Sequence, residues 1–134
     1  MLLIACLDDN NGMMFGSRRQ SKDRVLRAHM LDACADKVLW MTPYSAAQFE
    51  EDDRVQADAD YITKMQAQDA CFVEDGTFPT EPPSALLLYR WNRRYPADRY
   101  FPFDPLEAGY RLVSSEEFAG SSHERITADY YEKE

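Results

Sequence analysis

Two clusters of basic side chains, the second interleaved with aromatic residues, offer the clearest chemistry in this chain of 134 residues. The first cluster holds Arg18, Arg19, Lys22, Arg24 and Arg27. The second interleaves arginine with aromatic residues: Arg90, Arg93, Arg94 and Arg99 with Tyr89, Trp91, Tyr95 and Tyr100. Such mixtures bind phosphates or stack on bases. They equally form ion pairs with the chain's 24 acidic residues, which is the use we expect for most of them.

The histidines and cysteines point to no metal centre. His29 falls on the apolar stripe of a predicted helix, where a hydrogen-bonded structural histidine is expected. His123 follows Gly120-Ser121-Ser122, so a Ser–His pair can be imagined, but no orienting acid stands at a recognisable spacing. Cys6, Cys34 and Cys71 lie far apart without a Cys-x-x-Cys pair. This excludes a disulfide framework and a zinc knuckle, and it fits a reducing compartment.

The net charge of −9 disfavours general binding to nucleic acid or to an anionic membrane. The apolar opening ends at Asp8, too early for a signal peptide or for the roughly 20 residues of a membrane helix. We therefore expect a cytoplasmic monomer or homodimer without a membrane partner. With 45% hydrophobic residues, residues 1–134 have enough apolar material for a single domain.

The elements that would position these residues alternate between strands and helices in the first half of the chain. Residues 2–7 form a continuous apolar run, typical of a strand buried on both faces. The remaining expected strands cover 37–41, 70–73, 85–91, 110–114 and 126–132. Helices are expected at 22–34, with Ser21 as the N-cap, at 43–50 and at 58–68. This order predicts an α/β domain with a mixed or mainly parallel sheet.

Three segments together resemble dihydrofolate reductase. Residues 4–13 are similar to that family's first strand and the mobile loop after it. Residues 20–41 are similar to its acid-bearing helix and the next strand. Residues 87–91, 97–102 and 110–117 follow the order and spacing of its final strands. The resemblance covers a little more than half the chain and implies a shortened dihydrofolate-reductase-like three-layer sandwich, in which a mainly parallel central sheet is flanked by helices.

By position, the resemblance makes Asp23 the buried acid that holds and protonates a pterin ring. A carboxyl group in a crevice can have its pKa raised enough to donate a proton near neutrality. The plainer interpretation is an acid favoured by the helix dipole in the first helical turn. The family's apolar wall residue falls on Arg27, and the threonine that supports the acid falls on Tyr89.

The expected cofactor site departs from the family's pattern. The turn that meets the phosphates of the nicotinamide cofactor corresponds to Thr42-Pro43-Tyr44-Ser45, where only Ser45 keeps a comparable hydroxyl. The family's glycine pair corresponds to Glu74-Asp75, whose carboxylates would repel a diphosphate. The helix after that pair is replaced by residues 77–83, which are rich in proline. No cofactor is therefore expected, and NADPH would be required only by an active reductase.

The opening residues 8–15 and the segment 18–23 also resemble short bacterial proteins that carry an automatic "ribonuclease Z" label. That enzyme binds two metals through a His-x-His-x-Asp-His cluster. The present chain has only His29 and His123, so its residues do not support the label.

These observations leave two functional hypotheses. The leading one is a protein that has lost reductase activity and binds an anionic ligand or a protein partner near residues 18–27. The candidate ligand-binding residues are Arg18, Arg19, Arg27, Tyr44, Ser45 and Tyr89. The alternative is an active NADPH-dependent reductase of a pterin-like or other small substrate, with Asp23 as its catalytic acid.

Overall fold

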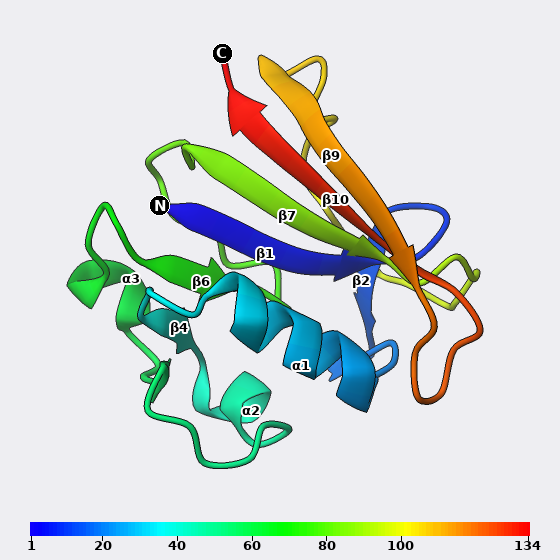
Figure 1. The fold of residues 1–134 in the computed structure, drawn as a ribbon, viewed down its shortest axis with the longest axis horizontal. Helices are drawn as coiled ribbons and strands as arrows, with labels where there is room; N and C mark the ends of the chain where they lie inside the picture. The colour runs from blue at the N-terminus through cyan, green and yellow to red at the C-terminus, as the bar shows by residue number, and fades with distance from the viewer.

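A seven-stranded sheet forms the centre of the molecule, with the strand order β5-β4-β6-β1-β7-β10-β9 (Figure 1). The computed structural model describes all 134 residues. The strands of this sheet are β1 (Leu2–Leu7), β4 (Leu39–Met41), β5 (Val55–Ala57), β6 (Ala70–Phe72), β7 (Ala85–Arg90), β9 (Tyr110–Phe118) and β10 (Ile126–Lys133). From β5 to β7 neighbouring strands are parallel, whereas β10 is antiparallel to both β7 and β9. The prediction of a mainly parallel α/β sheet is confirmed.

The central strand β1 is buried on both faces, as its unbroken apolar sequence predicts. Leu2 and Ile4 belong to one hydrophobic cluster, together with Leu26 and Met30 of α1 (Arg24–Ala33). Leu3 belongs to a second cluster on the opposite face. Because successive side chains of a strand point to opposite faces, one strand supports both layers of the core.

The two faces of the sheet are covered unequally. Helix α1 and the short α2 (Pro43–Ala46) lie on one face (Figure 1). On the other face the only helix is the single turn α3 (Tyr61–Lys64), whose Tyr61 joins the second cluster. Phe78, Phe101 and Phe103, from irregular segments, complete that layer. The expected helical layer is therefore reduced here to one turn and packed loops.

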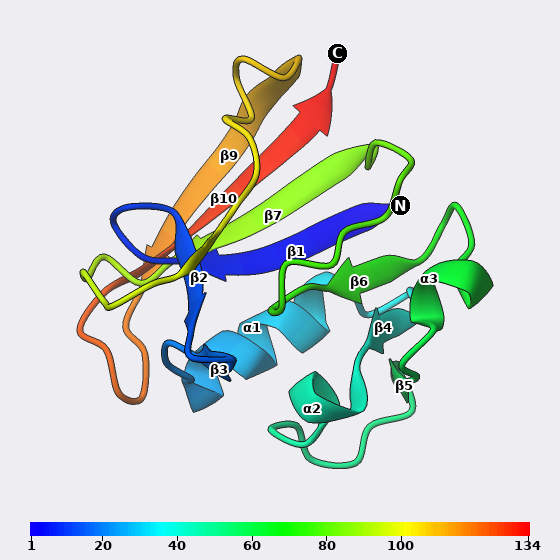
Figure 2. The same ribbon diagram turned by 180° about the vertical axis from the view of Figure 1, so that it is seen from behind.

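A second, three-stranded sheet has the order β3-β2-β8 and was not expected from the sequence (Figure 2). It consists of β2 (Gly12–Phe15), β3 (Arg18–Arg19) and β8 (Arg99–Tyr100). Strand β2 pairs with both of its neighbours in antiparallel register. In this small sheet Arg19 of the first basic cluster and Arg99 of the second pair with the same residue, Met14, from either side of β2.

Several predicted boundaries were wrong. Helix α1 begins after Asp23 and not after Ser21, because the Asp23 side chain accepts the free N–H groups of the first turn. The helix expected at 58–68 shrinks to α3, since Met65 is already extended. Strand β9 continues to Phe118 because it pairs with β10 along that length, and β5 was missed altogether. No helix in the chain combines the length and apolar character needed to cross a membrane.

Candidate functional site

Asp23 is the most highly connected carboxylate near the carboxyl end of the central strands. Its Oδ1 accepts hydrogen bonds from the backbone N–H groups of Val25, Leu26 and Ser121 at 2.9, 3.1 and 3.0 Å. Its Oδ2 accepts from the Ser122 N–H at 2.8 Å and from His123 Nδ1 at 3.0 Å. With five donors and 1% residue exposure, the carboxylate has no acceptor site left toward solvent.

The hydrogen bonds decide the charge of Asp23. Burial disfavours the ionised carboxyl, but the bonds from His123, Ser122, Ser121 and Leu26 outweigh it and hold the pKa of Asp23 well below its usual value. A proton donor at neutral pH needs the opposite shift. Asp23 joins the β9–β10 loop to α1 through the hydrogen bonds from Ser121, Ser122 and His123, and its catalytic role stays a prediction.

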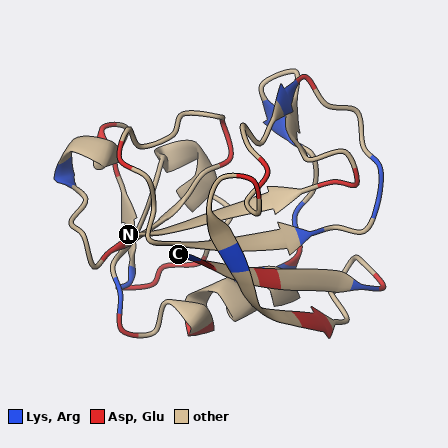
Figure 3. Ribbon diagram, turned by 90° about the horizontal axis from the view of Figure 1, so that it is seen from above, with Lys and Arg blue, Asp and Glu red and all other residues tan.

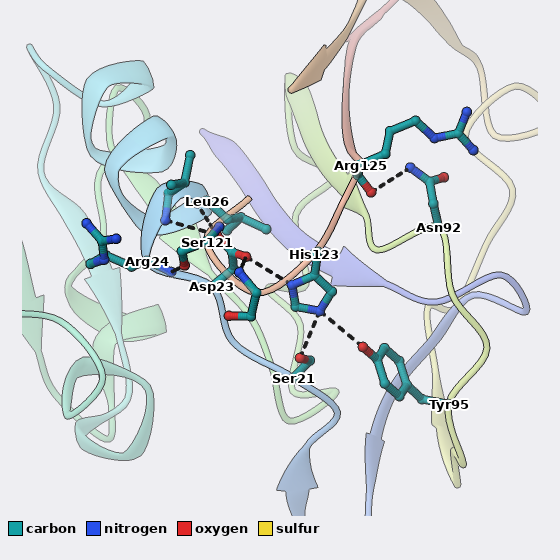
Figure 4. A network of polar contacts seen from close by, with 11 residues as sticks. Ser21, Asp23, Arg24, Leu26, Asn92, Tyr95, Ser121, His123 and Arg125 are labelled. Atoms are coloured by element: carbon teal, nitrogen blue, oxygen red, sulfur yellow. Dashed lines mark hydrogen bonds and ion pairs between the residues drawn. The ribbon is translucent and has the colours of Figure 1, made fainter. Parts of the chain in front are cut away.

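His123 lies between this carboxylate and two hydroxyl groups. Its Nε2 is 3.0 Å from Ser21 Oγ and 3.1 Å from the Tyr95 hydroxyl, while Nδ1 faces Asp23 (Figure 4). The Trp91 ring stacks on the imidazole with a centroid separation of 4.5 Å. The orienting acid that the sequence lacked is thus supplied by a residue 100 positions away.

A second polar cluster lies where β6 and β4 end. Glu74 accepts from Ser45 Oγ at 2.7 Å and from Gln48 at 3.2 Å, and it forms an ion pair with Arg19 at 3.0 Å. The Arg19 guanidinium also stands over the Tyr44 ring, 4.3 Å from its centroid. The structure therefore brings together three of the predicted ligand-binding residues, Arg19, Tyr44 and Ser45. The group they surround is the buried carboxylate of Glu74, which belongs to the chain itself.

A groove lies between α1 and α2. A cavity of about 430 Å³ elsewhere is larger but mostly apolar, whereas this groove of about 350 Å³ combines both kinds of side chain. It is lined by Arg24, Arg27, Ala28, Leu31, Gln48, Phe49 and Glu50. The Nη1 atom of Arg27 is buried and has no hydrogen-bond partner. An unpaired buried donor costs free energy, and no acceptor of the protein competes with a ligand for this guanidinium.

Tyr89 makes no hydrogen bond to Asp23. Its hydroxyl lies 2.7 Å from Nδ1 of His29, whose Nε2 lies 3.1 Å from Glu116. Both rings pack against Phe118, and Tyr89 is fully buried. His29 is therefore the hydrogen-bonded structural histidine that the sequence predicted, and Tyr89 is its partner below the surface.

Several other arginines of the two basic clusters lie at the surface. Arg18, Arg93 and Arg94 are exposed, and Arg99 donates to the backbone oxygen of Asp75. Acidic and basic segments are interspersed along the chain and do not gather into one basic face (Figure 3). No group of three or more His, Cys, Asp or Glu side chains is arranged to hold a metal ion.

Sequence reasoning missed His123 and Gln48 as partners in these clusters. His123 stands in a Gly-Ser-Ser loop whose position depends on the pairing of β9 with β10. The sequence holds no orienting acid at a spacing that is typical of a catalytic histidine. The relevant acid is close only after the sheet has formed.

Comparison with solved structures identifies the architecture. The chain is similar to dihydrofolate reductase from Enterococcus faecalis, solved as a complex with NADP(H) and RAB-propyl, with a TM-score of 0.67 and 8% sequence identity. The match covers 98% of this chain and 94% of that one. No protein-family model matches the sequence, and no curated protein matches it. The similarity establishes a dihydrofolate-reductase-like fold.

Proposed function

We propose that this protein is a dihydrofolate-reductase-like binding protein without reductase activity, which holds an anionic ligand in the groove between α1 and α2. The observation that carries the proposal is the Arg27 guanidinium, which lines that groove and forms no ion pair or side-chain hydrogen bond within the protein. An arginine has five N–H donors in a rigid fork suited to a carboxylate or phosphate. A ligand of this kind would supply the acceptor that the chain itself does not.

The rest of the groove indicates what else the ligand contains. Leu31 and Phe49 offer apolar contact, while Arg24 and Gln48 supply further donors. Glu50 lines the same groove and would repel a highly charged anion. A small molecule with one carboxylate or phosphate and an apolar body fits this combination. We propose that the protein acts in the cytoplasm as a monomer or homodimer.

The Glu74 cluster supports the absence of nicotinamide cofactor chemistry. In open α/β sheets ligands bind outside the carboxyl ends of the strands, where this chain places Glu74 at the end of β6. The carboxylate is 9% exposed and already satisfied by Ser45, Gln48 and Arg19. A diphosphate at this position would have to approach a negative charge, and it would find Arg19 already paired.

The state of Asp23 supports the same conclusion. A reductase acid has to hold a proton and pass it toward its substrate. Asp23 is instead an ionised carboxylate with five donors. The alternative, an active reductase that uses NADPH and Asp23, is favoured by one observation: the structural neighbour was solved with NADP(H).

Ligand titration separates the two functions. We would measure the melting temperature and the cofactor absorbance band while adding NADPH and dihydrofolate. We expect no stabilisation and no turnover. A ligand at a hundred times its dissociation constant would add about 2.7 kcal/mol, a shift that is easily seen. Turnover that disappears in Asp23→Asn would establish the reductase and exclude the binding-only function.

The groove is tested with a panel of small aromatic and aliphatic carboxylates and phosphomonoesters. We expect at least one to raise the melting temperature of the wild type and to lose this effect in Arg27→Met, which keeps the length of the side chain but removes its donors. The control is Arg111→Met, on the exposed face of β9. Equal stabilisation of both variants would place the ligand elsewhere.

A further inference from the structure

Ser21, His123 and Asp23 form a continuous hydrogen-bonded chain from the surface to a buried carboxylate (Figure 4). Both links, Ser21 Oγ to His123 Nε2 and His123 Nδ1 to Asp23 Oδ2, are 3.0 Å long. The exposed fractions of the His123 and Asp23 side chains are 3% and 0%, whereas Ser21 is half-buried. A hydroxyl, an imidazole and a carboxylate in this order are the parts of a nucleophilic catalytic site.

The protonation of this chain follows from Asp23. Because both carboxylate oxygens accept hydrogen bonds from backbone N–H groups, Asp23 is ionised and can only accept from His123. Nδ1 of the neutral imidazole therefore carries the proton, and Nε2 presents its lone pair to the Ser21 hydroxyl. This is the tautomer in which a histidine can remove a proton from serine.

The surroundings hold the imidazole in place. The Trp91 ring stacks on it at 4.5 Å between centroids, and the Gly120 N–H donates to the His123 backbone oxygen. The Tyr95 hydroxyl lies 3.1 Å from the same Nε2, so two hydroxyl groups compete for one lone pair. The N–H of Lys22, the residue after Ser21, makes no hydrogen bond within the protein and is free to donate to a developing oxyanion.

We propose that Ser21 is the nucleophile of an acyl-transfer site that hydrolyses small carboxylic esters. Ser21 Oγ attacks the ester carbonyl carbon while its proton moves to His123 Nε2. The C–O bond to the alcohol breaks, the alcohol oxygen takes that proton, and the acyl group stays on Ser21. Water then attacks the acyl carbon and gives a proton to Nε2. The Oγ–acyl bond breaks, Oγ recovers the proton, and the carboxylic acid leaves.

The decisive experiment is covalent labelling of the full-length protein with a fluorophosphonate. This reagent forms a phosphorus–oxygen bond to an activated serine and releases fluoride. Intact-mass spectrometry should show one adduct on the wild type, and peptide mapping should place it on Ser21. Ser21→Ala should remove the adduct, while Ser122→Ala, a serine in the adjoining loop, should keep it. An unlabelled wild type, or an adduct elsewhere, overturns the proposal.

Hydrolysis of p-nitrophenyl acetate tests the mechanism. We expect Ser21→Ala and His123→Gln each to lower the rate by at least about 100-fold, the usual contribution of a positioned general base. Equal rates in the wild type and Ser21→Ala overturn the proposal, since exposed lysines then account for the reaction.

Two further variants separate catalysis from folding and from the groove. Ser21→Cys preserves a nucleophile beside His123, so it should react with iodoacetamide faster than its own His123→Gln double variant. Equal reaction rates of the single and the double variant, with both melting at the wild-type temperature, would contradict a nucleophilic role for residue 21. Arg111→Met, on the exposed face of β9, should leave fluorophosphonate labelling unchanged, and none of the residues that line the groove belongs to the Ser21–His123–Asp23 chain. Failure of the groove experiment would therefore leave this proposal standing.

Discussion

Asp23 combines two tasks at one carboxylate, since it caps α1 and binds the β9–β10 loop. Replacing it with Asn keeps the shape but places an amide among five hydrogen-bond donors. We expect Asp23→Asn to lower the free energy of unfolding by roughly 3 kcal/mol, as breaking a buried charged pair does. Urea unfolding at pH 7 measures this. The control is Asp32→Asn on the exposed side of α1, and equal losses in the two variants would contradict the assignment.

The acid stability of the protein should depend on the same residue. Folding lowers the pKa of Asp23 from about 3.9 in the unfolded chain. Burial by itself would raise this pKa, but the hydrogen bonds from His123 and the loop amides outweigh burial. Its stabilisation is therefore fully present above the unfolded pKa and is lost as the pH falls toward the folded pKa. The urea midpoint of the wild type should drop between roughly pH 5 and pH 2. That of Asp23→Asn should drop less, and parallel curves would exclude Asp23 as a main cause.

At the scale of elements, the β9–β10 loop packs so closely against the first turn of α1 that position 120 has no room for a residue larger than glycine. A Cβ added to Gly120 would lie 2.3 Å from Asp23 Oδ2 and 2.8 Å from Ile126 Cδ1. The Asp23 carboxylate cannot move aside freely, because five hydrogen bonds hold it. The loop therefore approaches α1 closely only while residue 120 is glycine.

Gly120→Ala should destabilise the protein by about 1–3 kcal/mol, the usual range for overpacking. It should also slow the fluorophosphonate reaction at Ser21, because it displaces His123. Ser122→Ala is the matched control in the same loop, since it changes a side chain and keeps the N–H that binds Asp23. Chemical denaturation of the two variants provides the comparison. A Gly120→Ala protein as stable as Ser122→Ala would show that the loop can move away from α1 freely.

At the scale of the whole molecule, two cysteines report on the integrity of the sheet. Cys34 and Cys71 are both 0% exposed. Burial raises the pKa of the Cys34 thiol to about 11 and that of the Cys71 thiol to about 12. Because the thiolate is the reactive form, both groups should resist an aromatic disulfide reagent at pH 8.

Labelling of Cys34 and Cys71 in increasing urea should follow the loss of circular dichroism, because Cys34 packs in the hydrophobic cluster on one face of the sheet and Cys71 in the cluster on the other. Peptide mapping after each urea step identifies the labelled residues. Cys6, which is partly exposed, provides an internal comparison. Rapid labelling of Cys34 or Cys71 in the absence of urea would indicate that this part of the core opens locally, separately from global unfolding.

The amino-acid sequence determined the α/β class, the buried strand at residues 2–7 and the order of the long strands. These features depend on local apolar patterns, which each segment carries by itself. It also determined the irregular, proline-rich segment after β6 and the grouping of Arg19, Tyr44 and Ser45. The short strands β2, β3, β5 and β8 escaped prediction because two to four residues carry too little pattern, and pairing with neighbours defines them.

The tertiary structure alone decided the roles of the polar side chains. In the sequence, 100 positions separate Asp23 from His123, and 55 positions separate Arg19 from Glu74. No local spacing therefore predicts either pair. Whether Asp23 is a proton donor or a fixed anion depends on how many N–H groups reach it, and those come from α1 and from a loop near the other end of the chain. Hydrogen bonding and desolvation act over a few ångströms, and only the folded sheet brings these residues that close.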